Sequence, residues 1–447
     1  MFKKKWSLIP RWFLPVSLLM SVLLAMIPVC FISHSTLAAS PPAILWAKTY
    51  GGSKFDDFNC VQQTADGGYI GAGVTASSGA GMKDGFLVKT DASGNVQWQQ
   101  TFGGPADDGF NSVQQTADGG YIVAGYTMDE TIADLGWLVK TDAAGTKQWE
   151  QIMYSGNHQD EAQCVQQTAD GGYIVAGWGA VLGHSYDGWL WKTDASGNET
   201  GLHYYGGLSA DQLFSVQQTA DGGYIAAGMT ASYETTPTQA WLIKTDSGLT
   251  EQWHQIFMKD DNGAFYSARQ AADGGYIAAG CSYNQHEAWL VKTDSGGTKQ
   301  WDLTYGGPPT LNWGTSVQQT ADGGYVMAGR IVWAGYSQGW LVKADASGNQ
   351  QWNLALFASP PSLEGMLGAY SVQQTFDGGY IVAGFTDSDN PNGPGVDYDD
   401  AWLVKIAGEG PVAPVPEPAP LILLGTGLLL LGGLVVLGKR GAAETRR

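Results

Sequence analysis

Residues 112–125 read SVQQTADGGYIVAG and, after a variable stretch, residues 136–151 read GWLVKTDAAGTKQWEQ. Runs of aliphatic, β-branched and aromatic residues between turn residues predict four strands: around VQQT, at YIVAG, at WLVKT and through QW. The Ala-Asp-Gly-Gly segment between the first two is typical of a tight hairpin turn, because Gly supplies the positive φ. One unit is therefore predicted to be a four-stranded antiparallel sheet.

The unit recurs through most of the 447-residue chain. Its Asp-Gly-Gly-Tyr segment begins at seven positions that lie 49 to 55 residues apart: Asp66, Asp118, Asp170, Asp221, Asp273, Asp322 and Asp377. Four antiparallel strands in about 50 residues is the size of one β-propeller blade. We predict an all-β, seven-bladed β-propeller of four-stranded antiparallel blades over residues 40–407.

The two ends of the repeat array complement each other. The last unit stops after its third strand, at residues 402–406. An additional strand, ILWAKTYGG at residues 44–52, precedes the first unit and has the fourth-strand pattern. We expect this strand to complete the last blade, since closing the ring removes exposed sheet edges. A linear β-solenoid would have no use for such a pair of ends.

The repeated residues are interpreted as architecture. The DGGYIVAG and WLVKTD units resemble an exported bacterial and archaeal propeller-repeat family, most of whose members are functionally uncharacterised. The turn from Asp91 to Trp98 is also similar to an element of quinoprotein-type propellers, one residue shorter here. That resemblance implies that the Trp docks blade against blade, and it does not extend to quinone binding. The Gln pair is expected to hydrogen-bond between inner strands, with a polar channel lining as the alternative, and the turn Asp to act as an Asx-type cap.

The N-terminal segment is predicted to be a targeting signal. Residues 1–39 combine a basic start, an apolar stretch and small polar residues, which is the pattern of a secretory signal peptide. An uncleaved membrane anchor is the alternative, because the apolar stretch is long enough to span a bilayer.

The C-terminal segment is predicted to be a sorting signal. Residues 408–418 form a Pro-rich linker, residues 419–438 an uncharged run long enough for a transmembrane helix, and residues 439–447 a basic tail predicted to be cytoplasmic. With Pro416, Glu417 and Pro418 before the helix, this order resembles the PEP-CTERM signal of Gram-negative bacteria. The resemblance implies an exosortase-like processing enzyme as partner, besides the secretion machinery, and a place in the envelope or outside the cell, often with exopolysaccharide. A plain membrane anchor is the alternative.

Composition excludes some functions. The formal net charge is −19, and an acidic body repels phosphate backbones, so nucleic acid is not an expected partner. Beyond the signal the chain has three cysteines, which cannot all pair, and we interpret them as small buried residues. They show no metal-ligand spacing.

Function is expected where the blades differ. In a propeller the second-to-third loops and the blade-to-blade loops share one face, and here these loops are variable and rich in aromatic and polar groups. Candidate ligand-binding residues on this face are Trp178, His184, Tyr186, Tyr233, Trp313, Trp333, Tyr336, Asp399 and Asp400. Acids of the blade-to-blade loops join them: Asp56, Asp108, Asp160 and Asp211. Aromatics beside carboxylates suit a glycan site, and neutral loop drift is the alternative.

Catalytic motifs are poor. The segment at residues 335–339, GYSQG, fits Gly-x-Ser-x-Gly, but a nucleophile elbow needs a strand-to-helix turn and this segment lies in a loop of an antiparallel blade. Adjacent acids such as Asp399 and Asp400 are of the type that serves a glycosidase or binds Ca²⁺, yet adjacency in sequence fixes no geometry. We predict no catalytic residue and no cofactor, with Ca²⁺ as the one alternative.

Three functions remain as hypotheses. The first is a non-catalytic binding or scaffold protein of the cell envelope, with exopolysaccharide or another surface protein as its partner. The second is a secreted hydrolase or lyase that acts on polysaccharide through acids of the variable face. The third is a purely structural surface component.

Overall fold

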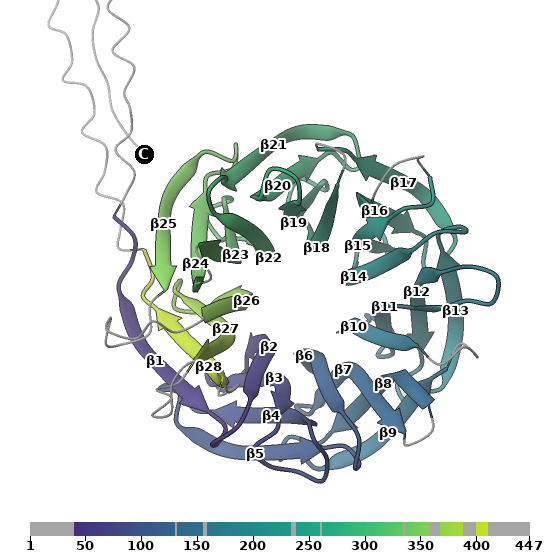
Figure 1. The fold of residues 1–447 in the computed structure, drawn as a ribbon, viewed down its shortest axis with the longest axis vertical. Coiled ribbons are helices and arrows are strands. Elements are labelled where there is room, and N and C mark those ends of the chain that lie inside the picture. Colours follow the sequence, from purple (N-terminus) through teal and green to yellow (C-terminus); the bar gives the residue numbers. More distant parts are fainter. Residues whose placement is uncertain are drawn as a thin grey trace, which may run out of the picture.

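The computed structural model describes residues 40–129, 132–154, 159–233, 238–259, 262–333, 336–356, 367–387 and 399–409. Within them, 28 strands form seven four-stranded antiparallel sheets arranged in a ring (Figure 1). The innermost strands line a central channel. The prediction of a seven-bladed β-propeller with four strands per blade is confirmed.

The first four blades run from the channel to the rim in chain order. Blade 1 consists of β2 (Asp56–Gln63), β3 (Tyr69–Thr75), β4 (Asp84–Thr90) and β5 (Val96–Phe102); blade 2 of β6 (Asp108–Gln115), β7 (Tyr121–Asp129), β8 (Ile132–Thr141) and β9 (Lys147–Met153); blade 3 of β10 (Asp160–Gln167), β11 (Tyr173–Ala180), β12 (Tyr186–Thr193) and β13 (Glu199–Tyr205); blade 4 of β14 (Asp211–Gln218), β15 (Tyr224–Thr230), β16 (Gln239–Thr245) and β17 (Glu251–Phe257).

The remaining three blades complete the ring. Blade 5 consists of β18 (Gly263–Gln270), β19 (Tyr276–Ser282), β20 (Glu287–Thr293) and β21 (Lys299–Gly306); blade 6 of β22 (Leu311–Gln319), β23 (Tyr325–Trp333), β24 (Tyr336–Ala344) and β25 (Gln350–Leu356); blade 7 of β26 (Leu367–Gln374), β27 (Tyr380–Asp387), β28 (Asp399–Ile406) and β1 (Ile44–Tyr50).

The N-terminal strand closes the ring. β1 pairs antiparallel with β28, from Ile44 opposite Ile406 to Tyr50 opposite Ala401, and Figure 1 shows the two lying side by side. The expected fourth strand of the last blade is therefore present, two residues shorter than the segment predicted from the sequence. Blade 7 thus joins residues from both ends of the array, and no blade is left with three strands.

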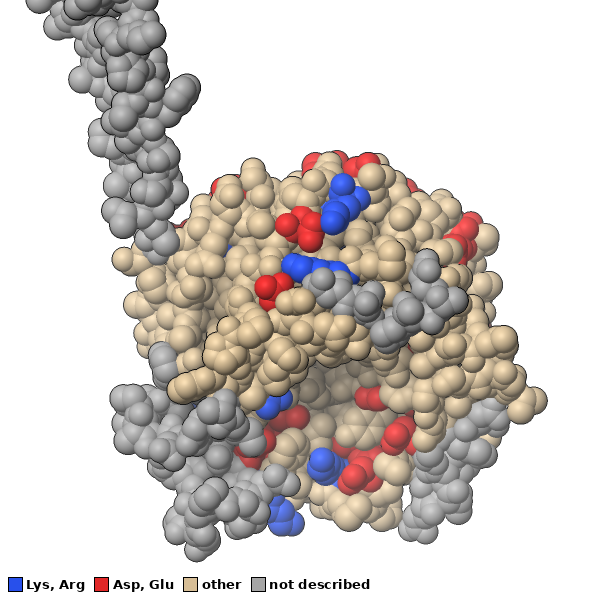
Figure 2. All heavy atoms as spheres, turned by 45° about the horizontal axis from the view of Figure 1, so that its top comes forward, with Lys and Arg blue, Asp and Glu red and all other residues tan. Residues whose placement is uncertain are grey.

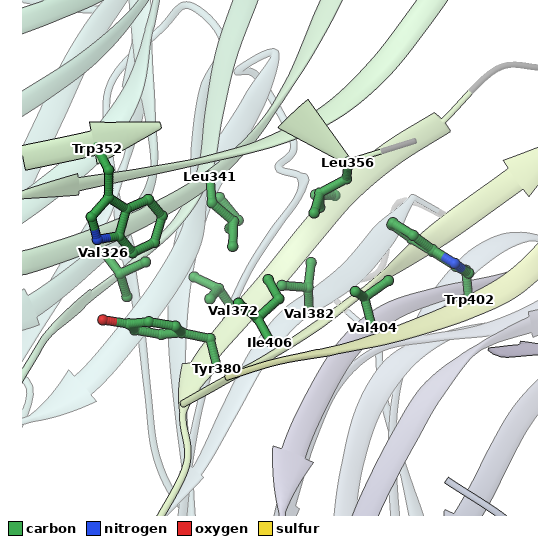
Figure 3. Close-up of a cluster of buried hydrophobic side chains, with 12 residues drawn as sticks. Val326, Leu341, Trp352, Leu356, Val372, Tyr380, Val382, Trp402, Val404 and Ile406 are labelled. Carbon is green, nitrogen blue, oxygen red and sulfur yellow. The ribbon is translucent and has the colours of Figure 1, made fainter. Parts of the chain in front are cut away.

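The hydrophobic core lies between neighbouring blades. Trp352 of β25 packs edge-to-face against Tyr380 of β27, with ring centroids 5.7 Å apart, and Trp402 is buried in the same cluster (Figure 3). Fourth-strand Trp residues contact the next blade's Tyr at five further junctions with centroid distances of 5.6–5.8 Å. The predicted docking role of these Trp residues is confirmed, and such aromatic pairs add stability beyond their buried area.

The repeated Gln pair ties the inner strands together. The backbone N–H of Gln115 in blade 2 donates to Oε1 of Gln62 in blade 1, at 2.5 Å. In return, the N–H of Ala65 in blade 1 donates to Oε1 of Gln115, at 2.8 Å. Equivalent bonds recur around the ring. The expected bonds between inner strands are confirmed, and several of these Gln residues also line the channel.

The hairpin turn between the first two strands of each blade is also a repeated design. In blade 1, Gly67 has a φ of 82° and Asp66 accepts the N–H of Gly68, which confirms the Asx-type cap. Lys89 of the third strand adds an ion pair with Asp66 at 2.9 Å. Partial burial opposes ionisation of Asp66, but the hydrogen bonds from Lys89, Thr64 and Gly68 outweigh it and lower its pKa to about 2.

The predicted segments at residues 1–39 and 410–447 lie outside the described residues. Among the residues that are described, no helix is long and apolar enough to cross a bilayer. The signal peptide, the transmembrane helix and the Pro416-Glu417-Pro418 motif therefore stay predictions.

Candidate functional site

A β-bulge interrupts the inner strand of every blade at the same place. In blade 1 the β2–β3 register skips from Phe58 to Cys60, so that Asn59 has no partner in the ladder. The same shift occurs in the other six inner strands. A bulge redirects the side chain of the additional residue. The seven bulge residues are Asn59, Asn111, Gln163, Phe214, Tyr266, Thr315 and Tyr370.

The bulge residues line a cavity at one end of the channel. Together with Trp313 and Arg330 they enclose about 420 Å³, and we call this cavity the funnel. It lies toward the variable loops, because each bulge is near the start of its inner strand. Figure 2 shows a face of the ring that is hollowed at its centre, with charged side chains around the hollow.

The channel forms a second cavity along the same seven strands. Its volume is about 350 Å³, and its lining comes from the Ser or Cys, Val and Gln positions that follow each bulge. Blade 5 departs from this pattern, because Arg269 stands where the other blades have Gln. The channel is therefore nearly uniform around its circumference, whereas the funnel is not.

One side of the funnel is lined by amides. Asn59 donates from Nδ2 to the backbone oxygen of Phe110 at 3.0 Å, and Asn111 donates from Nδ2 to the backbone oxygen of Ala162 at 3.1 Å. Asn111 also donates to the carboxylate of Glu161 at 2.9 Å. These bonds cross from one blade to the next, so the amides of blades 1 and 2 are held in place before any ligand arrives.

The other side of the funnel is aromatic. Phe214 and Tyr266 lie with ring centroids 5.3 Å apart, and Tyr370 lies 5.5 Å from Phe385 of β27. The hydroxyl of Tyr266 hydrogen-bonds to that of Tyr283, which orients the ring. Burial raises the pKa of Tyr266 well above its usual value, so the phenol stays neutral. Four blades, 4 to 7, thus present a preformed surface with aromatic faces and one cation, Arg330.

Two carboxyl groups lie close to residues of the funnel: Glu161 accepts a hydrogen bond from Asn111, and, besides burial, the charge of Asp57 helps to raise the pKa of Tyr370. Burial raises the pKa of Asp57 to about 7, against the opposing effects of the Val74 N–H, 3.1 Å from the carboxylate, and of Lys83. Burial also raises the pKa of Glu161, although Asn111 donates to it. Near neutral pH Asp57 is consequently protonated in a substantial fraction of molecules, and its carboxyl then adds little negative charge to the funnel.

Of the loop residues predicted from the sequence, Trp313 lines the funnel. Trp178 and Tyr186 instead form an edge-to-face pair with centroids 5.1 Å apart, and the Tyr186 hydroxyl donates to Gln159. The ring of His184 pairs through Nδ1 with Asp187 at 3.0 Å. These three residues belong to the β11–β12 hairpin of one blade.

The remaining predicted residues are spread over different blades. Tyr233 stacks on His254 with centroids 4.6 Å apart, and Trp333 is 58% exposed at the end of β23. Asp399 and Asp400 are half-buried at the start of β28, and the charge of Asp399 helps to raise the pKa of Asp57. The side chain of Tyr336 lies outside the described residues. The structure therefore does not gather the predicted residues into one site.

The acids of the blade-to-blade loops have a structural role. Asp56, Asp108, Asp160 and Asp211 are all 0% exposed. Asp56 accepts the N–H of Gly52 at 2.8 Å and the hydroxyl of Ser77 at 2.7 Å, and Asp108 and Asp211 accept the equivalent Gly N–H groups. The carboxylates of Asp56, Asp108 and Asp211 hold the turns between blades, and all four acids are buried, so none of them is exposed to a ligand in the funnel.

Sequence reasoning missed the bulge residues. A signal was present in the repeat itself: the position before the repeated Ser or Cys varies from amide to aromatic, whereas Val-Gln-Gln after it is nearly constant. A position that varies inside an otherwise repeated strand lies outside the pairing that the repeat requires.

The cysteines are unpaired in the structure. Cys281 is buried, as expected, and its thiol lies 3.8 Å from the Tyr266 hydroxyl. Cys60 and Cys164 are half-buried and line the channel, where burial raises the pKa of the Cys60 thiol. The described residues contain no cluster of three or more His, Cys, Asp or Glu side chains that could hold a metal ion.

Comparisons with known proteins assign the chain to no family. No family model and no curated protein matches it. A solved structure of a Dyadobacter fermentans protein of unknown function aligns over 81% of this chain and 99% of its own, with 13% identity and a TM-score of 0.48. The periplasmic gluconolactonase of Pseudomonas aeruginosa aligns over 76% of this chain and 96% of its own, with 12% identity and a TM-score of 0.45. We draw no functional conclusion from likeness at this level.

Proposed function

We propose that this protein is an exported propeller of the cell envelope that binds a saccharide in the funnel without transforming it. The observation that carries the proposal is the ring of bulge residues, which differs from blade to blade while the rest of each inner strand repeats. A cavity with a few placed polar groups on one side and aromatic rings on the other is typical of a ligand site.

The two sides of the funnel match the two kinds of surface on a sugar. Ring C–H groups of a saccharide pack on aromatic faces such as those of Phe214 and Tyr370. Its hydroxyls donate to amide oxygens such as those of Asn59 and Asn111, whose amino groups already donate to the neighbouring blade. A preformed site loses little conformational freedom on binding, which favours affinity.

The cellular setting of the proposal rests on the sequence. The predicted signal peptide and the resemblance to a PEP-CTERM signal support export, followed by membrane anchoring or exosortase-like processing in a Gram-negative envelope. Exopolysaccharide is then a ligand within reach of the funnel.

Saccharide binding by the purified full-length chain in detergent tests the proposal. A glycan array followed by titration calorimetry should find saccharide ligands. Phe214→Ala and Tyr370→Ala should each lower the affinity for them about tenfold, since the contact of an aromatic ring with a sugar ring is worth about 1 kcal/mol or more. Trp333→Ala, an exposed Trp outside the funnel, is the control and should bind as the wild type does. An array without ligands, or binding that survives both funnel substitutions, contradicts the proposal.

A polysaccharide hydrolase or lyase is the second candidate. The observation in its favour is the raised pKa of Asp57 and Glu161, because a carboxyl that is protonated near neutral pH can act as a general acid. If the protein is an enzyme, it should release reducing ends or unsaturated products from an array ligand, and Asp57→Asn should abolish that release while binding remains. Our proposal predicts no release by the wild type.

A further inference from the structure

The axial cavities have a charge opposite to that of the protein. The chain carries a formal charge of −19. Among the described residues that line the funnel and the channel there is no Asp or Glu, and each cavity has one Arg: Arg330 in the funnel and Arg269 in the channel. A cation at the centre of an acidic molecule, facing a cavity, indicates a ligand that carries negative charge.

Arg330 is held in place by its surroundings. It lies on β23 opposite Trp313 of β22 in the sheet register. Its Nε donates to the hydroxyl of Ser337, and its guanidinium carbon lies 5.6 Å from the ring centroid of Phe385. Within the described part of the chain, the two terminal nitrogens donate to no protein acceptor. They form a fixed pair of donors at the edge of the aromatic side.

A planar pair of N–H donors matches a carboxylate. Two parallel N–H···O bonds to a carboxylate are stronger and more directional than neutral hydrogen bonds, and the fork geometry selects a planar acceptor. The low-dielectric aromatic surroundings strengthen the attraction. Burial raises the pKa of Asp57 and of Glu161, which reduces the repulsion that a ligand carboxylate would meet from these two groups.

We infer that the ligand of the funnel is an acidic saccharide and that the carboxylate of a uronic acid unit binds Arg330. This inference rests on the proposed saccharide binding and adds its chemical class. The sugar ring stacks on the aromatic side, its carboxylate meets the guanidinium at the edge of that side, and its hydroxyls face the amides of blades 1 to 3.

Matched pairs of ligands separate this inference from the proposed function. Oligomers of galacturonate, mannuronate and glucuronate, each paired with its carboxyl-reduced neutral counterpart, are titrated into the full-length protein by calorimetry. We expect at least one acidic oligomer to bind about tenfold or more tightly than its neutral counterpart, and Arg330→Gln to remove that difference. Arg330→Lys keeps the charge without the fork and should recover part of the loss. Lys54→Gln removes an exposed charge outside the funnel and should change nothing.

The outcomes distinguish the two claims. Equal binding of acidic and neutral partners keeps saccharide binding and overturns the role of the carboxylate. A preference for acidic oligomers that survives in Arg330→Gln overturns the assignment to Arg330. If neither partner of any pair binds, and the array is also blank, the proposed function fails first. The comparison of acidic and neutral ligands uses wild-type protein, so it does not depend on how well a variant folds.

Discussion

The two ends of the same seven inner strands differ in what their side chains do. At the Val-Gln-Gln end, each Gln is used by the neighbouring blade, as Gln62 and Gln115 show, and the residue type repeats around the ring. At the bulge end, the ladder skips one residue, as it skips Asn59, and the residue type changes from blade to blade. The repeated positions thus make the same bond in blade after blade, whereas the side chains at the bulge differ in type from blade to blade.

In blade 5, one residue of the Val-Gln-Gln end departs from the repeat. Arg269 replaces the Gln whose Oε1 accepts an N–H from the next blade, and it donates instead to Ser215 and to the backbone oxygen of Ala268. Among the described residues, the bond equivalent to that between Gln115 and Gln62 is missing between blades 5 and 6. A residue that breaks the repeat at the expense of a bond between blades is a candidate for function.

The largest effect should come from a repeated packing position. Trp352→Ala removes a side chain that is 2% exposed and fills the junction between blades 6 and 7. We expect a loss of about 3–5 kcal/mol in the free energy of unfolding, from lost burial and the cavity left behind. Chemical denaturation of both proteins measures it. Trp333→Ala, at an exposed Trp of the same blade, should cost less than about 0.5 kcal/mol; equal losses would refute the distinction.

Near the bulge end of β2, the substitution Asp57→Asn should stabilise the folded protein. The folded-state pKa of Asp57 is about 7, above the unfolded value of about 3.9, so ionisation opposes folding and stability falls as pH rises from about 4 through 7. Lys83, Asp56 and Asp399 set its electrostatic surroundings. Asp57→Asn should leave the free energy of unfolding nearly unchanged at pH 4 and raise it at pH 8 by a few kcal/mol, which is the free energy that corresponds to the difference between the two pKa values.

Thermal unfolding at the two pH values checks this prediction. Asp56→Asn is the neighbouring control and should destabilise at pH 8, because Asp56 holds the Gly52 N–H and the Ser77 hydroxyl. The same sign of change in both variants would mean that the bulge end is as much a part of the fold as the turn beside it.

Two Gln residues of one strand offer a matched pair. Gln167 of β10 accepts the N–H of Ala117 at 2.8 Å and donates to the backbone oxygen of Gly171. Gln167→Ala should lower the free energy of unfolding by about 0.5–1.5 kcal/mol, since it removes a hydrogen bond between blades and one within the turn. Gln163→Ala, at the bulge of the same strand, should cost less. A larger loss at Gln163 would reverse the comparison.

The smallest change in the free energy of unfolding is expected at Arg269, the residue that departs from the repeat. Arg269→Gln restores the repeated residue and allows the missing bond between blades 5 and 6 to form. We expect a gain of about 1 kcal/mol in the free energy of unfolding. The reverse change in the preceding blade, Gln217→Arg, removes the acceptor of the Gln270 N–H and should cost a similar amount. If Arg269→Gln destabilises the protein, Arg269 serves the fold rather than a ligand.

The fold could be predicted because its determinants repeat. The number of blades follows from how often the Asp-Gly-Gly-Tyr turn and the once-per-blade Trp position recur. The unpaired strand at residues 44–52 indicated how the ring closes. Each of these signals is local and periodic, and pairing between neighbouring strands follows from short turns.

The site could not be predicted in the same way. Which side chains converge in the funnel depends on a register shift of one residue in each inner strand, and the sequence pattern alone does not show where a ladder skips. Trp313 was predicted for its loop and lies in the funnel, whereas Trp178 and Tyr233 pack within single blades. Burial of Asp56 likewise depends on a turn that closes over it.

Ring closure by β1 affects how the protein folds during its synthesis. A chain is synthesised from its N-terminus, so β1 is made first, yet its partner β28 is the last strand to be made. Until then β1 is a strand without a sheet, and the loop that its pairing closes is nearly as long as the propeller itself, which makes the step slow. The blades can form one after another during synthesis, but the ring closes only when β28 is available to pair with β1. A truncated chain would therefore keep an open ring with exposed strand edges, which favours aggregation and proteolysis.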